Sequence, residues 1–204
     1  MLLASSLVSA VGAAESPRAD FNDRTVLSVG LVGSDSSKDF QGQSLAFETT
    51  LATLPESRLL LGKTNIYVGA EYFRGNKHDN LDSELTESEV RLGLRMNIAP
   101  GSWIFFEEGY VQQKQESSGV FRRADSSSSR LGFEEVILED FLPSKQGKPA
   151  GLTVRVAAET YQNFDSTYSG YRVDLGYKSP VSFFFKRDFS GDEQTYGFNF
   201  THLF

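Results

Sequence analysis

The side chains that could carry out catalysis are few and lie far apart in the sequence. The chain has no cysteine and only two histidines, His78 and His202. Asp79 follows His78, and a carboxylate beside an imidazole is the pairing that orients a general base. However, no serine and histidine share one strand face, and Ser126–Ser129 is a low-complexity run rather than a positioned nucleophile. The sequence therefore predicts no catalytic residue, no cofactor and no metal site.

Charged residues that alternate with apolar ones predict a charged interior instead. Successive side chains of a β-strand point to opposite faces, so in residues 89–98 Arg91 and Arg95 lie opposite Val90 and Leu94. The same reasoning along the chain gives a set of inward positions, which we expect to form a lumen charge network or a pore lining. The set consists of Glu48, Glu71, Glu89, Arg91, Arg95, Arg130, Glu134, Arg155, Glu159, Arg172, Asp174 and Lys186, with Lys178 at a strand end.

The elements that must position these residues are short alternating segments. We expect about ten strands, with eight to twelve possible, near residues 26–33, 45–54, 64–73, 89–98, 103–113, 130–138, 152–161, 171–178, 181–187 and 196–204. At 204 residues the chain is long enough for one domain with a real core. After the first fourteen residues, no apolar stretch has the length of a membrane-crossing helix. The predicted fold is therefore all-β, and any membrane crossing is made by strands.

The connections between these segments fall into two alternating sets. Long polar stretches at 33–42, 74–88, 114–128, 163–169 and 188–194 are predicted loops on one rim. The other rim has mostly shorter turns that contain proline, such as the turn around Pro100. Long loops on one side and tight turns on the other are typical of up-and-down barrels in the outer membrane, with the long loops outside.

Two pairs of adjacent glutamate residues do not fit the alternation. Glu107-Glu108 and Glu134-Glu135 each interrupt strict alternation, and we expect a β-bulge to turn both members of a pair inward.

Aromatic residues near strand ends predict two girdles at the lipid–water boundaries. The inner girdle would contain Trp103, Tyr177 and Phe204, and the outer girdle Tyr72, Tyr110, Tyr161, Tyr171 and Tyr196.

The C-terminal segment carries the one motif of the chain. Tyr196, Phe198, Phe200 and Phe204 alternate with small, mostly polar residues, and His202 occupies the remaining place on the aromatic face. This ending resembles the closing strand of bacterial outer-membrane β-barrel proteins. The resemblance implies a transmembrane antiparallel up-and-down barrel, integral to the bacterial outer membrane. It also implies recognition of this strand by the barrel-assembly machinery and contact with outer-membrane lipid and lipopolysaccharide.

The N-terminal segment and the charge fit the same class. Residues 1–14 are apolar and end in small residues, as a secretory signal peptide does, although the basic start of such a peptide is missing. Residues 15–24 are then a periplasmic N-terminus, and residues 25–204 the barrel. A net charge of −7 argues against a nucleic-acid partner, because phosphate binding needs a basic face.

Several functions remain open from the sequence. The inward charges nearly balance, which favours a small non-enzymatic barrel with a filled lumen, whose loops serve surface interaction or envelope integrity. The alternative is a narrow porin for small polar or ionic solutes, or a barrel that binds a surface ligand. A lipid-modifying enzyme or protease of the outer membrane is a further alternative. The last is a soluble lipocalin-like barrel, in which Arg91, Arg95, Arg155 and Arg172 would face the solvent.

Overall fold

The computed structural model describes residues 25–35, 40–55, 62–77, 80–142, 150–162, 167–177, 179–191 and 193–203. Within these ranges, no helix has the length and apolar character needed to cross a membrane. Ten strands account for most of them: β1 (Val26–Asp35), β2 (Phe40–Leu54), β3 (Thr64–Lys77), β4 (Asn80–Ala99), β5 (Ser102–Ser117), β6 (Val120–Leu142), β7 (Ala150–Gln162), β8 (Thr167–Leu175), β9 (Val181–Asp188) and β10 (Gln194–Leu203).

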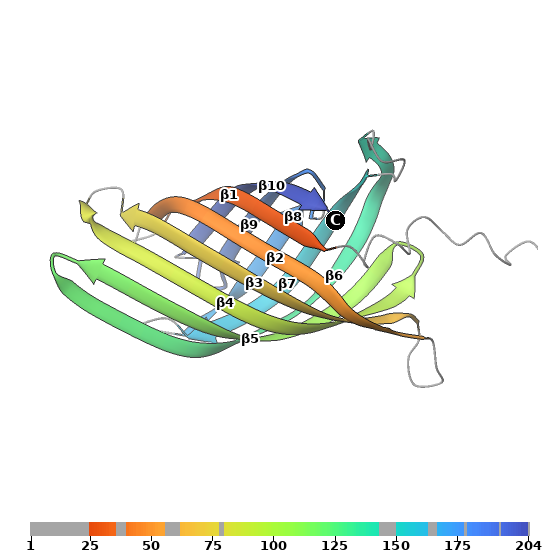
Figure 1. The fold of residues 1–204 in the computed structure, drawn as a ribbon, viewed down its shortest axis with the longest axis horizontal. Coiled ribbons are helices and arrows are strands. Elements are labelled where there is room, and N and C mark those ends of the chain that lie inside the picture. Colours follow the sequence, from red (N-terminus) through yellow and green to blue (C-terminus); the bar gives the residue numbers. More distant parts are fainter. Residues whose placement is uncertain are drawn as a thin grey trace, which may run out of the picture.

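The strands form one closed antiparallel barrel. Each strand pairs with its neighbours in sequence, and β1 closes the barrel against β10, with Val26 opposite Leu203. The strands run obliquely, and β1 begins at the same end of the barrel at which β10 finishes (Figure 1). The prediction of a ten-stranded up-and-down barrel is confirmed. Closure leaves each strand a partner on both sides, so the alternating segments satisfy their backbone groups without a second sheet.

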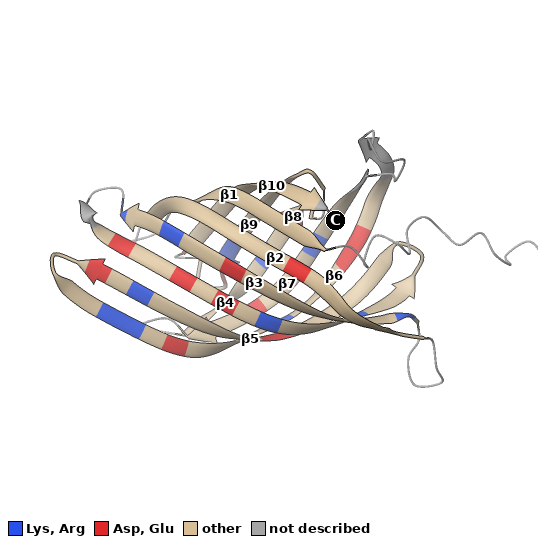
Figure 2. Ribbon diagram, in the orientation of Figure 1, with Lys and Arg blue, Asp and Glu red and all other residues tan. Residues whose placement is uncertain are grey.

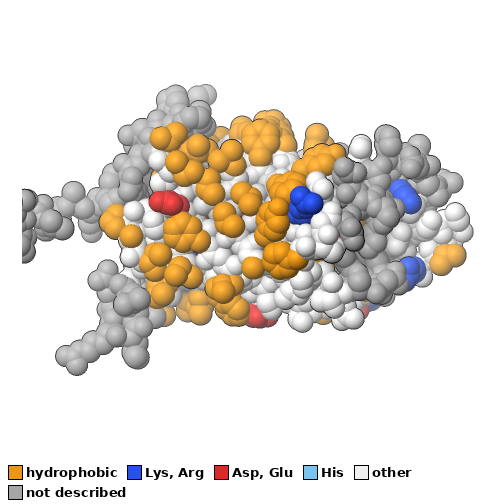
Figure 3. All heavy atoms as spheres, turned by 180° about the vertical axis from the view of Figure 1, so that it is seen from behind, with side chains coloured by type: hydrophobic (Ala, Val, Ile, Leu, Met, Phe, Trp, Pro, Cys, Tyr) orange, Lys and Arg blue, Asp and Glu red, His pale blue; other side chains and the backbone are white. Residues whose placement is uncertain are grey.

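The barrel has its apolar face outside and its charged face inside. On β4, Leu92 and Leu94 are 56 % and 46 % exposed, whereas Arg91 and Arg95 are 6 % and 0 % exposed. Apolar side chains cover much of the outer wall in the view of Figure 3. The lipocalin-like alternative is therefore wrong, because its arginines would be solvent-facing and its apolar residues inside.

Four strands extend further into the predicted loops than the sequence indicated. The predicted loops at 74–88 and 114–128 are wrong: β3 continues to Lys77, β4 already begins at Asn80, β5 continues to Ser117, and β6 already begins at Val120. A tight turn at Ser118 and Gly119, both with positive φ, joins β5 and β6. The two strands form a hairpin that projects beyond the rest of the barrel, at the lower left of Figure 1. The hairpin is polar on both faces, so it lacks the apolar alternation that reveals a lipid-facing strand.

The proposed bulges at the two Glu pairs are also wrong. The register of β5 with β6 is continuous from Ser102 to Ser117, and that of β6 with β7 is continuous past Glu134. Alternation therefore holds: Glu107 and Glu134 point inward and are 1 % and 0 % exposed, while Glu108 and Glu135 lie exposed on the outer face. The outer face tolerates Glu108 because Ser129 Oγ donates a hydrogen bond to it at 2.8 Å.

The aromatic girdles are only partly as predicted. Tyr72, Tyr110 and Tyr196 are 42 %, 52 % and 51 % exposed on the outer face, and Tyr171 lies there beside Phe185. Three residues assigned to the girdles instead point into the lumen: Trp103, Tyr161 and Tyr177. Tyr177 turns inward because β8 ends at Leu175 and Gly176 adopts φ of 76°, which interrupts the alternation.

Some predictions fall on residues outside the described ranges. These are the signal peptide at 1–14, the N-terminal segment at 15–24, the His78-Asp79 pair, Lys178 and Phe204.

Candidate functional site: a charge network in the lumen

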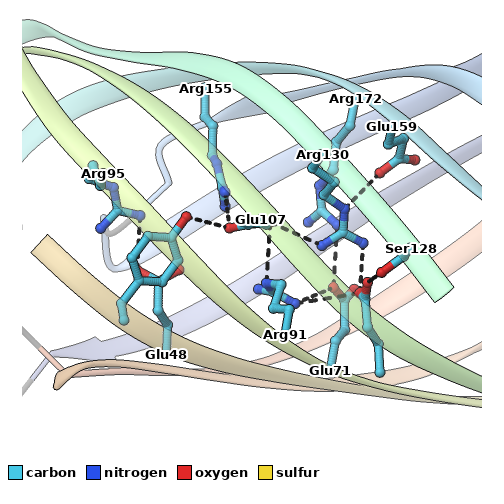
Figure 4. A network of polar contacts seen from close by, with 12 residues as sticks. Glu48, Glu71, Arg91, Arg95, Glu107, Ser128, Arg130, Arg155, Glu159 and Arg172 are labelled. Carbon is cyan, nitrogen blue, oxygen red and sulfur yellow. Dashed lines mark hydrogen bonds and ion pairs between the residues drawn. The ribbon is translucent and has the colours of Figure 1, made fainter.

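The structure places all twelve residues predicted for the lumen inside the barrel. They come from seven of the ten strands, β2 to β9 without β5, and each lies in an ion pair with an oppositely charged residue. Figure 4 shows most of them pointing toward one another across the middle of the lumen. The network therefore crosses the lumen from wall to wall instead of following one strand pair.

At one end of the network, Arg95 holds two carboxylates. Its Nη2 lies 3.0 Å from Glu48 Oε1, and its Nε lies 3.2 Å from Glu134 Oε2. The guanidinium also stacks over the Tyr67 ring, 4.3 Å from the ring centre. Tyr177 donates a hydrogen bond to the second oxygen of Glu48. The side chains of Arg95 and Glu134 are both 0 % exposed, so this cluster is fully buried inside the lumen.

Glu107 is the centre of the network. Its carboxylate accepts hydrogen bonds from Arg155 Nη2 and, at 2.7 Å, from Tyr67 Oη. Arg130 Nη1 lies 3.4 Å away and Arg91 Nε 3.5 Å away. Three buried guanidinium groups thus share one buried carboxylate. Arg155 also lies over the Phe105 ring, 3.8 Å from its centre.

Arg130 links this centre to the opposite walls. Its Nη2 lies 2.6 Å from Glu89 Oε2, and its Nε lies 3.1 Å from Glu159 Oε2. Ser128 Oγ donates a 2.6 Å hydrogen bond to the other oxygen of Glu89. Lys186 Nζ approaches Glu159 Oε1 at 3.7 Å. Arg130 therefore contacts carboxylates from β4, β5 and β7 at once.

A further cluster lies around Glu71. Its carboxylate is 3.3 Å from Arg172 Nη1 and 3.6 Å from Arg91 Nη1. Arg172 also binds Asp174, with 2.8 Å between Nη2 and Oδ1. The side chains of Glu71 and Arg172 are 17 % and 12 % exposed, more than those at the centre. This part of the network therefore borders the open space of the lumen.

Small residues on the inner face make room for the large side chains. A Cβ at Gly93 would lie 2.3 Å from Cζ of Tyr67, so the tyrosine ring occupies the place that a side chain at 93 would fill. Likewise, a Cβ at Gly69 would lie 2.8 Å from Nε of Arg91. Without these close approaches, a ten-stranded barrel would not hold so many long side chains at one level.

Sequence reasoning missed the central residue. Glu107 was left out because its neighbour Glu108 made the inward face of that segment ambiguous. The strand register contains the signal that would have found it, because Glu107 lies directly opposite Arg130, and Arg130 in turn opposite Glu159. Tyr67, Ser128 and Tyr177 were also missed, since uncharged polar residues on an inner face give no distinct pattern.

Within the described ranges, the part of the lumen wall formed by β1 and β10 contributes no residue to the network. In the described parts of β1 and β10, the single charged residue is Asp35 at the outer end of β1. Figure 2 shows the charged positions concentrated on the other strands. The inner face along this seam carries small polar groups, with Ser28 Oγ and Thr201 Oγ1 2.9 Å apart and Ser44 donating to Asn199 at 3.2 Å.

Ion pairs outside the wall are of a different kind. Arg74 donates to Glu84 at 2.8 Å, and Arg123 donates to Asp125 at 3.0 Å. The hydrogen bond and the negative charge raise the pKa of each arginine above its usual value. Because these pairs are solvent-exposed, they contribute little to stability.

Among the described side chains, no group of three or more histidine or acidic residues is arranged to hold a metal ion.

Together these features define the class of the protein: a closed up-and-down barrel with an apolar exterior and a charge-paired interior, the architecture of transmembrane β-barrels. No protein-family model matches the chain, and no curated protein matches it. Among solved structures, the chain is similar to Ail, the attachment invasion locus protein of Yersinia pestis. The TM-score is 0.43 at 10 % identity, covering 89 % of this chain and 97 % of that one. At this level the similarity adds nothing to the fold, which the strand pairing establishes by itself.

Proposed function

We propose that the protein is a small, non-enzymatic barrel of the bacterial outer membrane. The charge network closes its lumen, and the projecting hairpin of β5 and β6 is available for surface interaction. The observation that carries the proposal is the set of ion pairs around Glu107, which crosses the lumen and is almost fully buried. A conducting pore usually has charge of one sign in excess along an open path. Here seven carboxylates meet five arginines and a lysine, so the two signs of charge nearly balance.

A lipid environment explains the outer face. Leu31, Leu131 and Phe200 are 64 %, 59 % and 63 % exposed, on strands far apart in the sequence. Such a surface around a whole barrel would be costly in water but favourable in hydrocarbon. The aromatic face of β10 points outward, which fits a role of Tyr196, Phe198 and Phe200 in recognition by the barrel-assembly machinery and in contact with lipid and lipopolysaccharide.

The projecting hairpin is the surface that we assign to interaction outside the membrane. β6 pairs with β5 from Val120 onward, but among the described residues its pairing with β7 begins only at Ser128. Within the described residues, the backbone of Val120–Ser127 therefore presents one edge without a neighbouring strand. Phe121 at the tip of this edge is 62 % exposed. Open edges of this kind accept further strands or peptide partners.

A narrow pore is the second candidate, and one observation favours it. Two cavities of about 90 and about 40 Å³ lie in the lumen between the uncharged seam and the charge network, and Glu71 lines both of them. Arg91 and Arg172, which form ion pairs with Glu71, also line the inner cavity. Rearrangement of this cluster would open a narrow polar path.

Surface presentation can be tested with a protease site inserted between Ser118 and Gly119, in cells that express the protein. We expect protease added to intact cells to cut at this turn, while the folded barrel keeps its heat-modifiable gel mobility. The matched control is the same insertion at the β4–β5 turn, beside Gly101, which lies at the opposite end of the barrel. Cleavage at the control site but not at the hairpin would contradict the proposed orientation.

A further inference from the structure

The outer part of the lumen contains a cavity of about 90 Å³ that the charge network does not fill. Its floor includes Glu71 and Lys186, which belong to the network. Its walls combine polar side chains with a group of aromatic and aliphatic ones. The apolar lining consists of Val32, Phe40, Phe73, Leu85, Tyr161 and Phe184. This apolar group is unexpected on the inner face, because a lumen in contact with water favours polar side chains.

Opposite walls of the barrel supply this apolar lining. Phe184 reaches into the cavity because Gly197 faces it on β10, where a Cβ would lie 2.1 Å from Cε1 of the ring. Phe73 faces it from β3, in register with Glu87 on β4. Phe40 and Phe184 are 3 % and 5 % exposed, so their rings are fixed by packing. The walls are thus suited to holding the apolar body of a small ligand.

The charges around the cavity are unequal. Three carboxylates line it, those of Glu71, Glu87 and Glu193, against one ammonium group, that of Lys186. Glu71 is neutralised by Arg91 and Arg172, and Lys186 is engaged by Glu159. Glu87 differs: Gln113 donates a 2.7 Å hydrogen bond to it, and it forms no ion pair with a described residue. The cavity therefore offers a half-buried carboxylate that forms no ion pair with a described residue, although the ammonium group of Lys186 lines the same cavity.

We propose that this cavity is a binding site for a small organic cation with an apolar or aromatic body, with Glu87 as the counter-charge. Aromatic rings attract cations through their negative faces, and Tyr161 already lies 6.0 Å from the ammonium nitrogen of Lys186. An organic cation would place its apolar body against Phe40, Phe73 and Phe184. An anion would meet the carboxylates of Glu87 and Glu193, while Lys186 is already held by Glu159.

This inference goes beyond the proposed function, because a closed barrel and an open pore could each carry such a site. The test uses the wild-type protein in phosphatidylglycerol nanodiscs, where neither detergent nor a choline headgroup competes for the cavity. Binding of tetramethylammonium, a cation small enough for a cavity of about 90 Å³, is measured by calorimetry and compared with tert-butanol and methanesulfonate, which have a similar size but no charge or a negative charge. We expect tetramethylammonium to bind and the other two to bind at least about tenfold more weakly, a difference of about 1.4 kcal/mol.

Two variants and one control locate the site. E87Q keeps the shape and the hydrogen bond to Gln113 but removes the charge, and should weaken binding of the cation about tenfold. L85W fills the cavity from the same strand and should abolish binding. E84Q is the matched control, since Glu84 lies on β4 but faces outward toward Arg74, and its binding should equal that of the wild type.

Three results would overturn the proposal: no binding of tetramethylammonium, tighter binding of methanesulfonate, or an E87Q variant with unchanged affinity. Heat-modifiable mobility of each variant establishes that it is folded. Conductance of the same preparations is recorded separately, so a missing site and a conducting lumen give different results.

Discussion

Replacement of Glu107 by glutamine keeps the volume of the side chain and removes one negative charge at the centre of the lumen. Glutamine can still accept the hydrogen bond of Tyr67, which measures 2.7 Å in the wild type. Arg130 retains Glu89 at 2.6 Å and Glu159 at 3.1 Å. Arg91 retains Glu71 and Glu89, both at 3.6 Å. The loss therefore falls mainly on Arg155.

The size of the effect follows from what Arg155 keeps. Among the described residues, Glu107 is the one carboxylate in an ion pair with Arg155, whose side chain is 5 % exposed. Breaking a buried ion pair on one side costs about 3–5 kcal/mol. The rings of Phe105 and Tyr177, at 3.8 and 4.6 Å, still stabilise the guanidinium and offset about 1 kcal/mol of this cost. We therefore expect E107Q to lower the free energy of unfolding by about 2–4 kcal/mol.

The assay is equilibrium unfolding in urea from phosphatidylcholine vesicles. The single tryptophan of the chain, Trp103, reports on the lumen directly, because it points inward and is 3 % exposed. E108Q is the matched control: Glu108 is adjacent, but it faces outward and accepts a hydrogen bond from Ser129. Its change should be within about 1 kcal/mol. A double variant, E107Q with R155M, should recover part of the loss, since removal of both charges of a buried pair is often nearly neutral.

Equal stabilities of E107Q and E108Q would refute the reasoning. That result would mean that the arginines around Glu107 are hydrated in the lumen and do not depend on it for neutralisation. A double variant less stable than E107Q alone would also contradict the account, because it would show that groups other than Glu107 stabilise Arg155 by more than the contribution of about 1 kcal/mol assigned to the two rings.

Three further predictions test other parts of the structure. E71A removes the carboxylate that lines both lumen cavities and should produce ion conductance in planar bilayers, whereas E84Q, on the outer face of β4, should leave the bilayer without conductance, as the wild type does. G93V should displace the Tyr67 ring, because even a Cβ at position 93 would lie 2.3 Å from Cζ of the ring. We expect the free energy of unfolding in urea to fall by about 1–3 kcal/mol. An unfolding midpoint equal to that of the wild type would show that the ring can move into other space. F200D places a charge on the outer face of β10, where Phe200 is 63 % exposed. It should reduce the fraction of protein that refolds into vesicles, measured by heat-modifiable gel mobility, whereas F200L should refold as well as the wild type. Equal refolding of F200D and the wild type would argue against a lipid-facing position of residue 200.

The class of fold and most of the lumen set follow from period-two alternation. On β4, one pass of the sequence separates Arg91 and Arg95 from Leu92 and Leu94, and the structure has them on opposite faces. This works because lipid imposes an apolar outer face and the closed lumen a polar inner one. The pattern is strongest where both solvents act, in the middle of each strand.

The remaining features lie where that contrast is absent. The hairpin of β5 and β6 was predicted as a loop because both of its faces meet water above the lipid. Glu107 was missed because Glu108 beside it is also acidic, and only the pairing with Arg130 distinguishes the two. The inward position of Tyr177 depends on the backbone at Gly176, and the outer cavity depends on side chains from eight strands. Neither can be derived from local alternation.

The central claim, that the charge network closes the lumen, is tested most directly by single-channel recording of the refolded wild-type protein in a planar bilayer. Folding and insertion are established first by heat-modifiable gel mobility, so that an absence of conductance can be attributed to the folded barrel. We predict no steady conductance from the wild type. A steady conductance that changes in ion selectivity when Arg91 and Arg95 are replaced by neutral residues would contradict the claim, because the same side chains would then line an open path.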